Sequence, residues 1–353
     1  MQNHYVRRSA RLKFAITFAL SIILPVVSAC HVVHQQVEVE KLLTPLTNAD
    51  TARLIAVVNG LVGVRSLHGR VDIQFEDTSF ATSGIAEKYR TADGSITLQR
   101  PGKVYLIVQT PVIPSDVAQM TSDGEHFRIA ILKGDEKYRR FVMGTNNAVY
   151  SKLDMDGSAN ADPNPKRKGK ANSEAQTVSA LSNLRPQHLT DALLLRPIDP
   201  RTPGILYVQS EFFQSEKDPG RTDSNKRIVR GYYLLDEVQP SSDGMAKLLR
   251  RFWFDRVGGI RLARLQSFDD KGALVNDVTY GELKKFGAEG NVMMPGQVSL
   301  TRPQDHYKIS ITYQTPETLT VDKDYSPEAF VLTNKWGLPE VDLDAKKSTT
   351  PKD

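Results

Sequence analysis

Apolar and polar residues alternate along most of the chain beyond residue 66, and this period of two is typical of strands that bury one face and leave the other in water. Val71, Ile73 and Phe75, for example, are separated by Asp72 and Gln74. Turn-forming Gly, Pro, Asn and Asp residues stand between the alternating runs. The pattern therefore predicts consecutive antiparallel hairpins.

Twelve such runs recur through the chain, and we expect about ten or eleven strands with one apolar face from them. They occupy residues 67–75, 85–99, 103–110, 126–132, 138–143, 205–213, 228–237, 249–255, 259–268, 274–286, 292–300 and 307–315. So many strands cannot all pack on one short helix, so the sheet must curl around its own apolar side. The expected result is an open or closed barrel whose interior could leave a cavity for an apolar ligand.

Two stretches have helical spacing instead. Residues 47–64 contain the capping candidates Asn48 and Asp50 and carry apolar residues three or four apart, at Leu54, Val57, Val58, Leu61 and Val62. Residues 186–195 are apolar at Leu189, Ala192, Leu193 and Leu195 and begin with a proline. We expect both helices inside the mouth of the barrel.

Strand alternation also selects the side chains that would line the interior. In the last strand Ile309 and Ile311 are predicted to face inward, and Lys308, Ser310 and Thr312 to face water. The complete inward set consists of Val71, Ile73, Phe75, Leu98, Leu106, Val108, Phe127, Ile129, Phe252, Phe254, Ile309 and Ile311. These residues are the candidate lipid-binding cavity.

The first 29 residues have the form of an export signal. Arg7, Arg8, Arg11 and Lys13 precede a largely apolar run at residues 14–24, which is too short to span a bilayer comfortably. Val27-Ser28-Ala29-Cys30 follows and matches the lipobox of bacterial lipoproteins, in which the cysteine thiol receives diacylglycerol. The alternative interpretation is an uncleaved anchor helix.

Lipidation at Cys30 also accounts for the one cysteine of an exported chain without a disulfide. Because one acyl chain binds a membrane only marginally, stable anchoring needs at least two, such as palmitate chains. His31 follows Cys30, so the aspartate that retains some lipoproteins at the inner membrane is missing. The periplasmic face of the outer membrane is therefore the expected location.

The pI near 9.1 suggests a nucleic-acid binder at first sight. However, the signal carries four basic residues and no acidic ones, so its removal lowers the formal charge from +5 to +1. A nearly neutral mature chain lacks the electrostatic footprint of nucleic-acid binding. Nucleic acid is therefore not an expected partner.

The expected domain organisation places a lipidated tether at residues 30–46 and one β domain at 47–335. Residues 154–185 interrupt this domain with a segment that contains the basic, Pro/Gly-rich stretch 162–170, interpreted as a mobile surface insertion. Contact of its four basic residues with anionic lipid is the alternative. Residues 336–353 are expected to form a disordered tail.

Common catalytic motifs are absent from the sequence: it has no Gly-x-Ser-x-Gly elbow, no His-Glu-x-x-His, no phosphate-binding loop and no paired cysteines. His68, His126, His188 and His306 are scattered and are interpreted as surface or strand residues. Asp269-Asp270 resembles a turn, and Asp322 with Asp324 does not supply a calcium site. We expect no enzyme activity, no metal and no cofactor.

Several segments resemble the LolA/LolB-like lipoprotein carrier superfamily over about residues 47–332. They are SLHGRVDIQF (66–75), GSITLQRPGKVYLIV (94–108) with its Arg-Pro strand end, TSDGEHFRI (121–129), RFWFDRVGGIRL (251–262) and YSPEAF (325–330). The resemblance implies a mainly β (α+β) fold, an open antiparallel half-barrel with an N-terminal helix and a helical lid. It also implies binding of acyl chains. An exposed apolar loop of the receptor type would best fit residues 111–114, for which a strand-end turn is the alternative.

Two functions follow. The first is a lipid-anchored protein that holds an acyl chain or the lipid of a lipoprotein in an apolar cavity, for transport, sorting or envelope maintenance. The second is a sensing or interaction protein that resembles RseB-type regulators, with a filled barrel and an envelope protein as its partner. Neither makes or breaks a bond.

Overall fold

The computed structural model describes residues 40–78, 87–88, 91–110, 115–134, 136–146, 184–218, 226–241 and 244–345. The predicted signal, Cys30, the loop at 111–114 and residues 154–183 of the predicted insertion lie outside these residues. Among the described residues, no helix is both long enough and apolar enough to cross a membrane.

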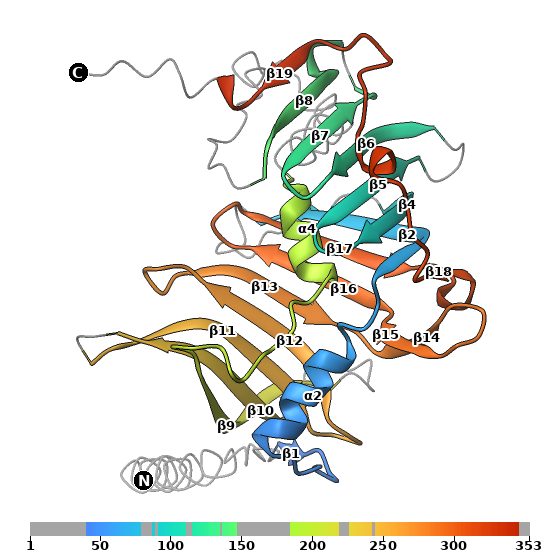
Figure 1. Cartoon of the computed structure of the whole chain (residues 1–353). Coiled ribbons are helices and arrows are strands. Elements are labelled where there is room, and N and C mark those ends of the chain that lie inside the picture. Colours follow the sequence, from blue (N-terminus) through green and yellow to red (C-terminus); the bar gives the residue numbers. More distant parts are fainter. Residues whose placement is uncertain are drawn as a thin grey trace, which may run out of the picture.

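The described chain is mainly β and forms one large, mostly antiparallel sheet that stays open (Figure 1). Seventeen strands belong to this sheet and two form a separate hairpin. The first half contains β1 (Lys41–Leu42), β2 (Ser66–Asp77), β3 (Glu87–Lys88), β4 (Ala92–Gln99), β5 (Lys103–Gln109), β6 (Asp116–Ser122), β7 (His126–Ile131) and β8 (Arg140–Thr145). The second half contains β9 (Leu206–Lys217), β10 (Arg227–Pro240), β11 (Ala246–Asp255), β12 (Arg261–Phe268), β13 (Leu274–Tyr280), β14 (Leu283–Phe286), β15 (Val292–Pro295), β16 (Gln297–Arg302), β17 (Tyr307–Tyr313), β18 (Thr320–Val321) and β19 (Glu340–Asp342).

Most strands pair with the strand next to them in sequence, and β2 joins the two halves of the sheet, while the short strands β1 and β19 add to β10 and β8. The strand β2 pairs with β4 on one side and with β17 on the other, where Ile73 lies opposite Ile311 and Phe75 opposite Ile309. The ladder therefore runs from β8 through β2 and β17 to β9. As a result, β8 and β9 lie at opposite ends of the sheet (Figure 1).

Two α-helices occur among the described residues, α2 (Thr51–Gly60) and α4 (Pro186–Leu193). The α2 helix begins at Asp50, whose side chain accepts a hydrogen bond from the Arg53 amide as an N-cap. It contacts β9 and β12, whereas α4 contacts β5, β6 and β16. Both helices bury their apolar residues in the same core cluster as the strands, so they cover one face of the sheet, which we call the inner face.

The structure has more strands than the ten or eleven predicted. Tertiary contacts add short strands that local patterns do not predict, and they divide some of the predicted ones. The predicted strands 274–286 and 292–300 are each divided, at Gly281 and Gly296. The β14–β15 hairpin leaves the main sheet at these two glycines. A Cβ at Gly296 would lie 2.7 Å from the Lys284 side chain, so only glycine fits this bend without a shift.

The interpretation of residues 336–353 as a disordered tail does not hold for the first part of this range. Glu340–Asp342 forms β19, which pairs in parallel with β8, and Leu338 and Leu343 are buried. Leu338 packs with Ala130 and Phe141 in a small second cluster. Burial of these two leucines stabilises the ordered structure of a segment whose other residues are mostly polar.

Candidate functional site

The chain crosses the inner face between β8 and β9, and we call residues 184–198 the crossing segment. It contains α4 and seven apolar residues that are at most 7% exposed: Leu184, Leu189, Ala192, Leu193, Leu194, Leu195 and Ile198. Leu184 lies near the end of the predicted mobile insertion, but in the structure it is fully buried. An eight-residue helix is marginal in water, so packing on the sheet must supply most of the stability of α4.

The structure brings the twelve residues of the predicted cavity together in the cluster that also contains the apolar residues of the crossing segment. All of them belong to one core cluster and are at most 7% exposed, and we call them the inner floor. Ile309 and Ile311 face inward as predicted, while Lys308 and Thr312 are partly exposed. Ser310 is buried, contrary to the prediction, because its hydroxyl hydrogen bonds to Ser299 at 2.8 Å on the opposite face of the sheet.

Arg100 connects the crossing segment to the end of the first helical region. Its Nη1 donates to the Leu195 carbonyl and its Nε to the Val64 carbonyl, both at 2.9 Å. Burial lowers the pKa of Arg100, but the guanidinium stays charged at any physiological pH. The sequence comparison singled out Arg100-Pro101 only as a strand end, because these carbonyl partners depend on tertiary structure.

Asn59 of α2 makes the second connection. Its Nδ2 donates to the Ile198 carbonyl at 2.9 Å, and its Oδ1 accepts from the Ile198 amide at 2.8 Å. The side chain therefore satisfies both backbone groups of one residue, as a neighbouring strand would. The crossing segment and α2 are thus joined to each other as well as to the sheet.

His188 makes a third connection, which sequence analysis missed. Its Nδ1 lies 2.8 Å from the Tyr307 hydroxyl, and the Tyr307 ring stacks on Phe75 of the inner floor at 5.6 Å between centroids. Burial and the nearby Arg302 lower the pKa of His188 to about 3, so the ring is neutral at pH 7. Its position beside Leu189 in an apolar helix was the available signal.

Two further contacts hold α4. The hydroxyl of the buried Tyr280 donates to the Ala192 carbonyl at 3.3 Å, and the Arg185 guanidinium lies 5.1 Å from the centre of the Phe127 ring. Apart from these few polar contacts, apolar packing attaches the crossing segment to the floor. Apolar packing is not directional, so another apolar chain could replace it.

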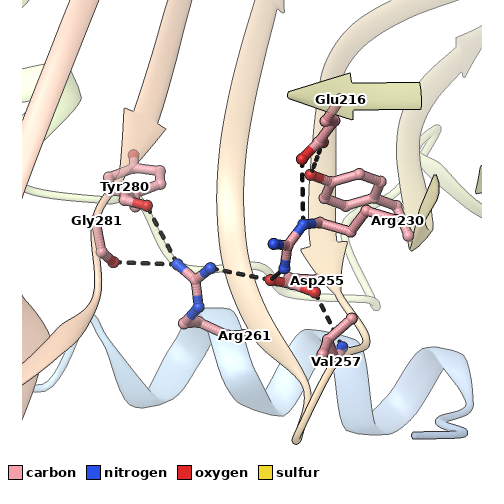
Figure 2. Close-up of polar contacts among 8 residues, drawn as sticks. Glu216, Arg230, Asp255, Val257, Arg261, Tyr280 and Gly281 are labelled. Atoms are coloured by element: carbon pink, nitrogen blue, oxygen red, sulfur yellow. Dashed lines mark hydrogen bonds and ion pairs between the residues drawn. The ribbon is translucent and has the colours of Figure 1, made fainter. Parts of the chain in front are cut away.

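A second candidate lies on the outer face, where a polar network joins the ends of four strands (Figure 2). Asp255 accepts from Arg230 at 2.7 Å, from Arg261 at 3.1 Å and from the Val257 amide at 2.9 Å. Arg230 also bonds to Glu216, which accepts from Tyr232. Burial and the bond to Glu216 raise the pKa of Tyr232.

A hollow of about 460 Å³ lies beside this network and is lined by Glu216, Lys217, Arg230, Tyr232, Asp255, Val257, Arg261 and Glu282. Its three acidic and three basic side chains balance in formal charge. The carboxylate of Asp255 is already satisfied by three donors. This arrangement is suited to fastening strand ends, and no sequence motif had indicated it.

Of three comparisons with known proteins, only the comparison with solved structures found matches. No family profile matches the sequence, and no curated protein matches it either. A DUF1329 family protein from Desulfovibrio piger has 12% identity and a TM-score of 0.38, over 79% of this chain and 95% of that one. A LolA superfamily protein from Nitrosomonas europaea has 10% identity and a TM-score of 0.38, over 80% and 99%.

A third structure, a putative outer membrane lipoprotein-sorting protein domain from Vibrio parahaemolyticus, has 10% identity and a TM-score of 0.36, over 79% of this chain and 94% of that one. Two of these three structures are described as LolA superfamily or outer membrane lipoprotein-sorting proteins.

Proposed function

We propose that this protein is a membrane-anchored periplasmic lipoprotein that binds acyl chains on its inner floor, beneath the crossing segment, without catalysing a reaction. One observation carries the proposal. The twelve apolar residues of the floor belong to one core cluster that spans strands of both halves of the sheet, and the short crossing segment packs into this cluster with few polar contacts.

Binding requires the crossing segment to move, because the floor is covered in the described structure. Burying about ten methylenes of an acyl chain contributes about 0.8 kcal/mol each. The same floor also loses its contacts with Leu189, Ala192 and Leu193, so only the difference between the two occupants appears as affinity. This competition makes binding reversible, as a carrier needs.

The proposed anchor is Cys30, with residues 1–29 as the signal and 30–46 as the tether. β1 begins at Lys41 and pairs in parallel with β10 at Ile228, so the start of the described chain lies beside β10. Lys41 is eleven positions after Cys30, a distance of at most about 40 Å when the chain is extended. The end of the sheet formed by β9 and β10 would then be held near the outer membrane.

The remaining domain assignments belong to the same proposal. Residues 47–335 would form the half-barrel, with α2 as its N-terminal helix and the crossing segment as its helical lid. Residues 154–185 would form the insertion that leads into this lid, although Leu184 already belongs to the core.

A filled barrel that binds an envelope protein, as in RseB-type regulators, is the second candidate function. The complete burial of the inner floor favours it, because a packed core needs no ligand. Acyl-chain binding predicts that lipid is found with the purified protein, and the filled barrel predicts that none is.

Native mass spectrometry of the full chain after mild detergent extraction tests the proposal. We expect a mass increment from non-covalent lipid that disappears on collisional activation, beside the covalent acyl mass that remains. A protein that carries the covalent mass alone, and that stays free of lipid when incubated with phospholipid vesicles, would contradict acyl-chain binding and favour the filled barrel.

A further inference from the structure

The strand β9 has a hydrogen-bonding edge that no described strand covers. Within the described residues it pairs with β10 alone, in a register without a bulge from Leu206 to Lys217. Its other edge therefore presents backbone N–H and C=O groups outward. The opposite end of the sheet differs, since β19 covers β8 there.

β9 carries few of the usual protections of an edge strand: two glutamates, Glu211 and Glu216, and a lysine at its last residue, Lys217. Residues 206–216 contain no proline, glycine or lysine. Four apolar side chains are exposed instead: Leu206 by 55%, Val208 by 52%, Phe212 by 41% and Phe213 by 48%. A long, regular and apolar edge is a template for pairing with another strand.

We propose that two copies of this chain associate by antiparallel pairing of their β9 strands, with Ser210 opposite Ser210 of the second copy. In this register Phe212 lies opposite Val208, and Phe213 opposite Tyr207. Each pair occurs twice because of the two-fold symmetry. Cross-strand pairs of aromatic and β-branched residues stabilise a sheet by about 0.2–1 kcal/mol each.

The charges on β9 are compatible with this register and disfavour the one centred on Glu211. Glu211 lies opposite Gln209, so no like charges meet among residues 206–214. A shift that centres the pairing on Glu211 would place two carboxylates directly opposite each other, which is destabilising. The strand can therefore pair with itself without opposed like charges, and for this reason we take a second copy as the occupant.

The pairing involves only nine residues of each copy, from Leu206 to Gln214. Stable protein complexes usually bury about 1,200–2,000 Å², and a single short ladder lies at or below this range. The dimer is therefore expected to form and dissociate with protein concentration. Association of this kind is independent of acyl-chain binding on the inner floor.

Disulfide cross-linking in the full-length protein tests the register. Directly opposed residues in an antiparallel pair have Cα atoms about 4.5–5.5 Å apart, within the range of a disulfide. Ser210→Cys should give a covalent dimer on mild oxidation. Ser215→Cys is the matched control on the same strand, because its two copies would lie about 34 Å apart. The wild-type protein, oxidised in the same way, shows how much cross-linking occurs through Cys30 alone.

A second measurement uses exposed apolar residues on and off the edge. Val208→Lys should shift the sedimentation of the extracted protein from dimer to monomer, whereas Met245→Lys, at a side chain 69% exposed between β10 and β11, should not. The proposal is overturned if Ser210→Cys stays monomeric in a folded protein, if both cysteine variants cross-link equally, or if the product contains a different protein.

Discussion

The Nη1 of Arg100 donates to the main-chain carbonyl of Leu195 at 2.9 Å. This bond joins the sheet to the crossing segment, because Arg100 directly follows β4 and Leu195 belongs to that segment. The same guanidinium donates to Val64. This side chain is therefore one of the groups that attach the crossing segment to the sheet.

Replacing Arg100 should loosen this attachment. Arg100→Met removes two charge-assisted hydrogen bonds, and we expect the free energy of unfolding to fall by about 2–3 kcal/mol in urea titration. Arg70→Met is the control, because Arg70 bonds only to Gln314 on an exposed part of the sheet and should change stability by less than about 0.5 kcal/mol. Equal stability of the two variants would show that Arg100 does not hold the segment.

Protonation of His188 should destabilise the protein in acid. Its pKa falls from the ordinary value of 6.5 to about 3 on folding, so the unfolded chain binds the extra proton between these values. Stability from the neutral ring is fully present above pH 6.5 and declines as pH falls toward 3, by up to about 1.4 kcal/mol per pH unit.

Other groups also titrate in this range, so the measurement is a comparison of urea unfolding at several pH values between wild type and His188→Gln. The variant should have a shallower decline below pH 6.5. His126→Gln, at a side chain 53% exposed, measures the effect of removing a surface histidine. Parallel profiles of wild type and His188→Gln would refute the assignment.

The outer-face network should contribute to stability rather than to ligand binding. Asp255→Asn leaves Arg230 and Arg261 without their shared carboxylate, and loss of one partner of a buried ion pair costs about 3–5 kcal/mol. Asp270→Asn, at a side chain 93% exposed, should change stability by less than about 1 kcal/mol. Thermal unfolding of both variants decides between these expectations, and similar melting points would contradict them.

Cys30→Ser should leave an unlipidated precursor, because a serine hydroxyl cannot form the thioether that lipoprotein processing requires. Metabolic labelling with a fatty-acid analogue, followed by gel analysis, measures this directly. We expect label on the wild type alone. Label that persists on the variant would place the acyl group elsewhere.

Local sequence patterns predicted the part of the structure that depends on neighbours along the chain. Alternation placed Ile309 and Ile311 on the buried face because side chains in a strand change sides at every residue. Ser310 lies on the face opposite Ile309 and Ile311, as predicted, but it is buried there, where its hydroxyl hydrogen bonds to Ser299 of the adjacent strand. The strand β19 was missed because its parallel partner β8 lies almost 200 residues earlier.

The polar contacts of the candidate site could not be predicted in this way. Arg100, Asn59 and His188 each bond to a residue more than 90 positions away. Their residue types alone are compatible with ordinary surface positions, and only the crossing of residues 184–198 over the inner face brings them to their partners. The floor itself was predictable, since it requires only apolar alternation.

Photo-labelling tests the central claim, acyl-chain binding on the inner floor, most directly. The extracted protein is incubated with a diazirine-bearing fatty acid, irradiated and mapped by peptide mass spectrometry, with excess unlabelled fatty acid as competitor. We expect competed label on β17 around Ile309 and Ile311 and on β2 around Ile73, and less label in Ile311→Ala than in the partly exposed control Thr312→Ala. Label confined to outer-face peptides, or label that the competitor does not reduce, would contradict the claim.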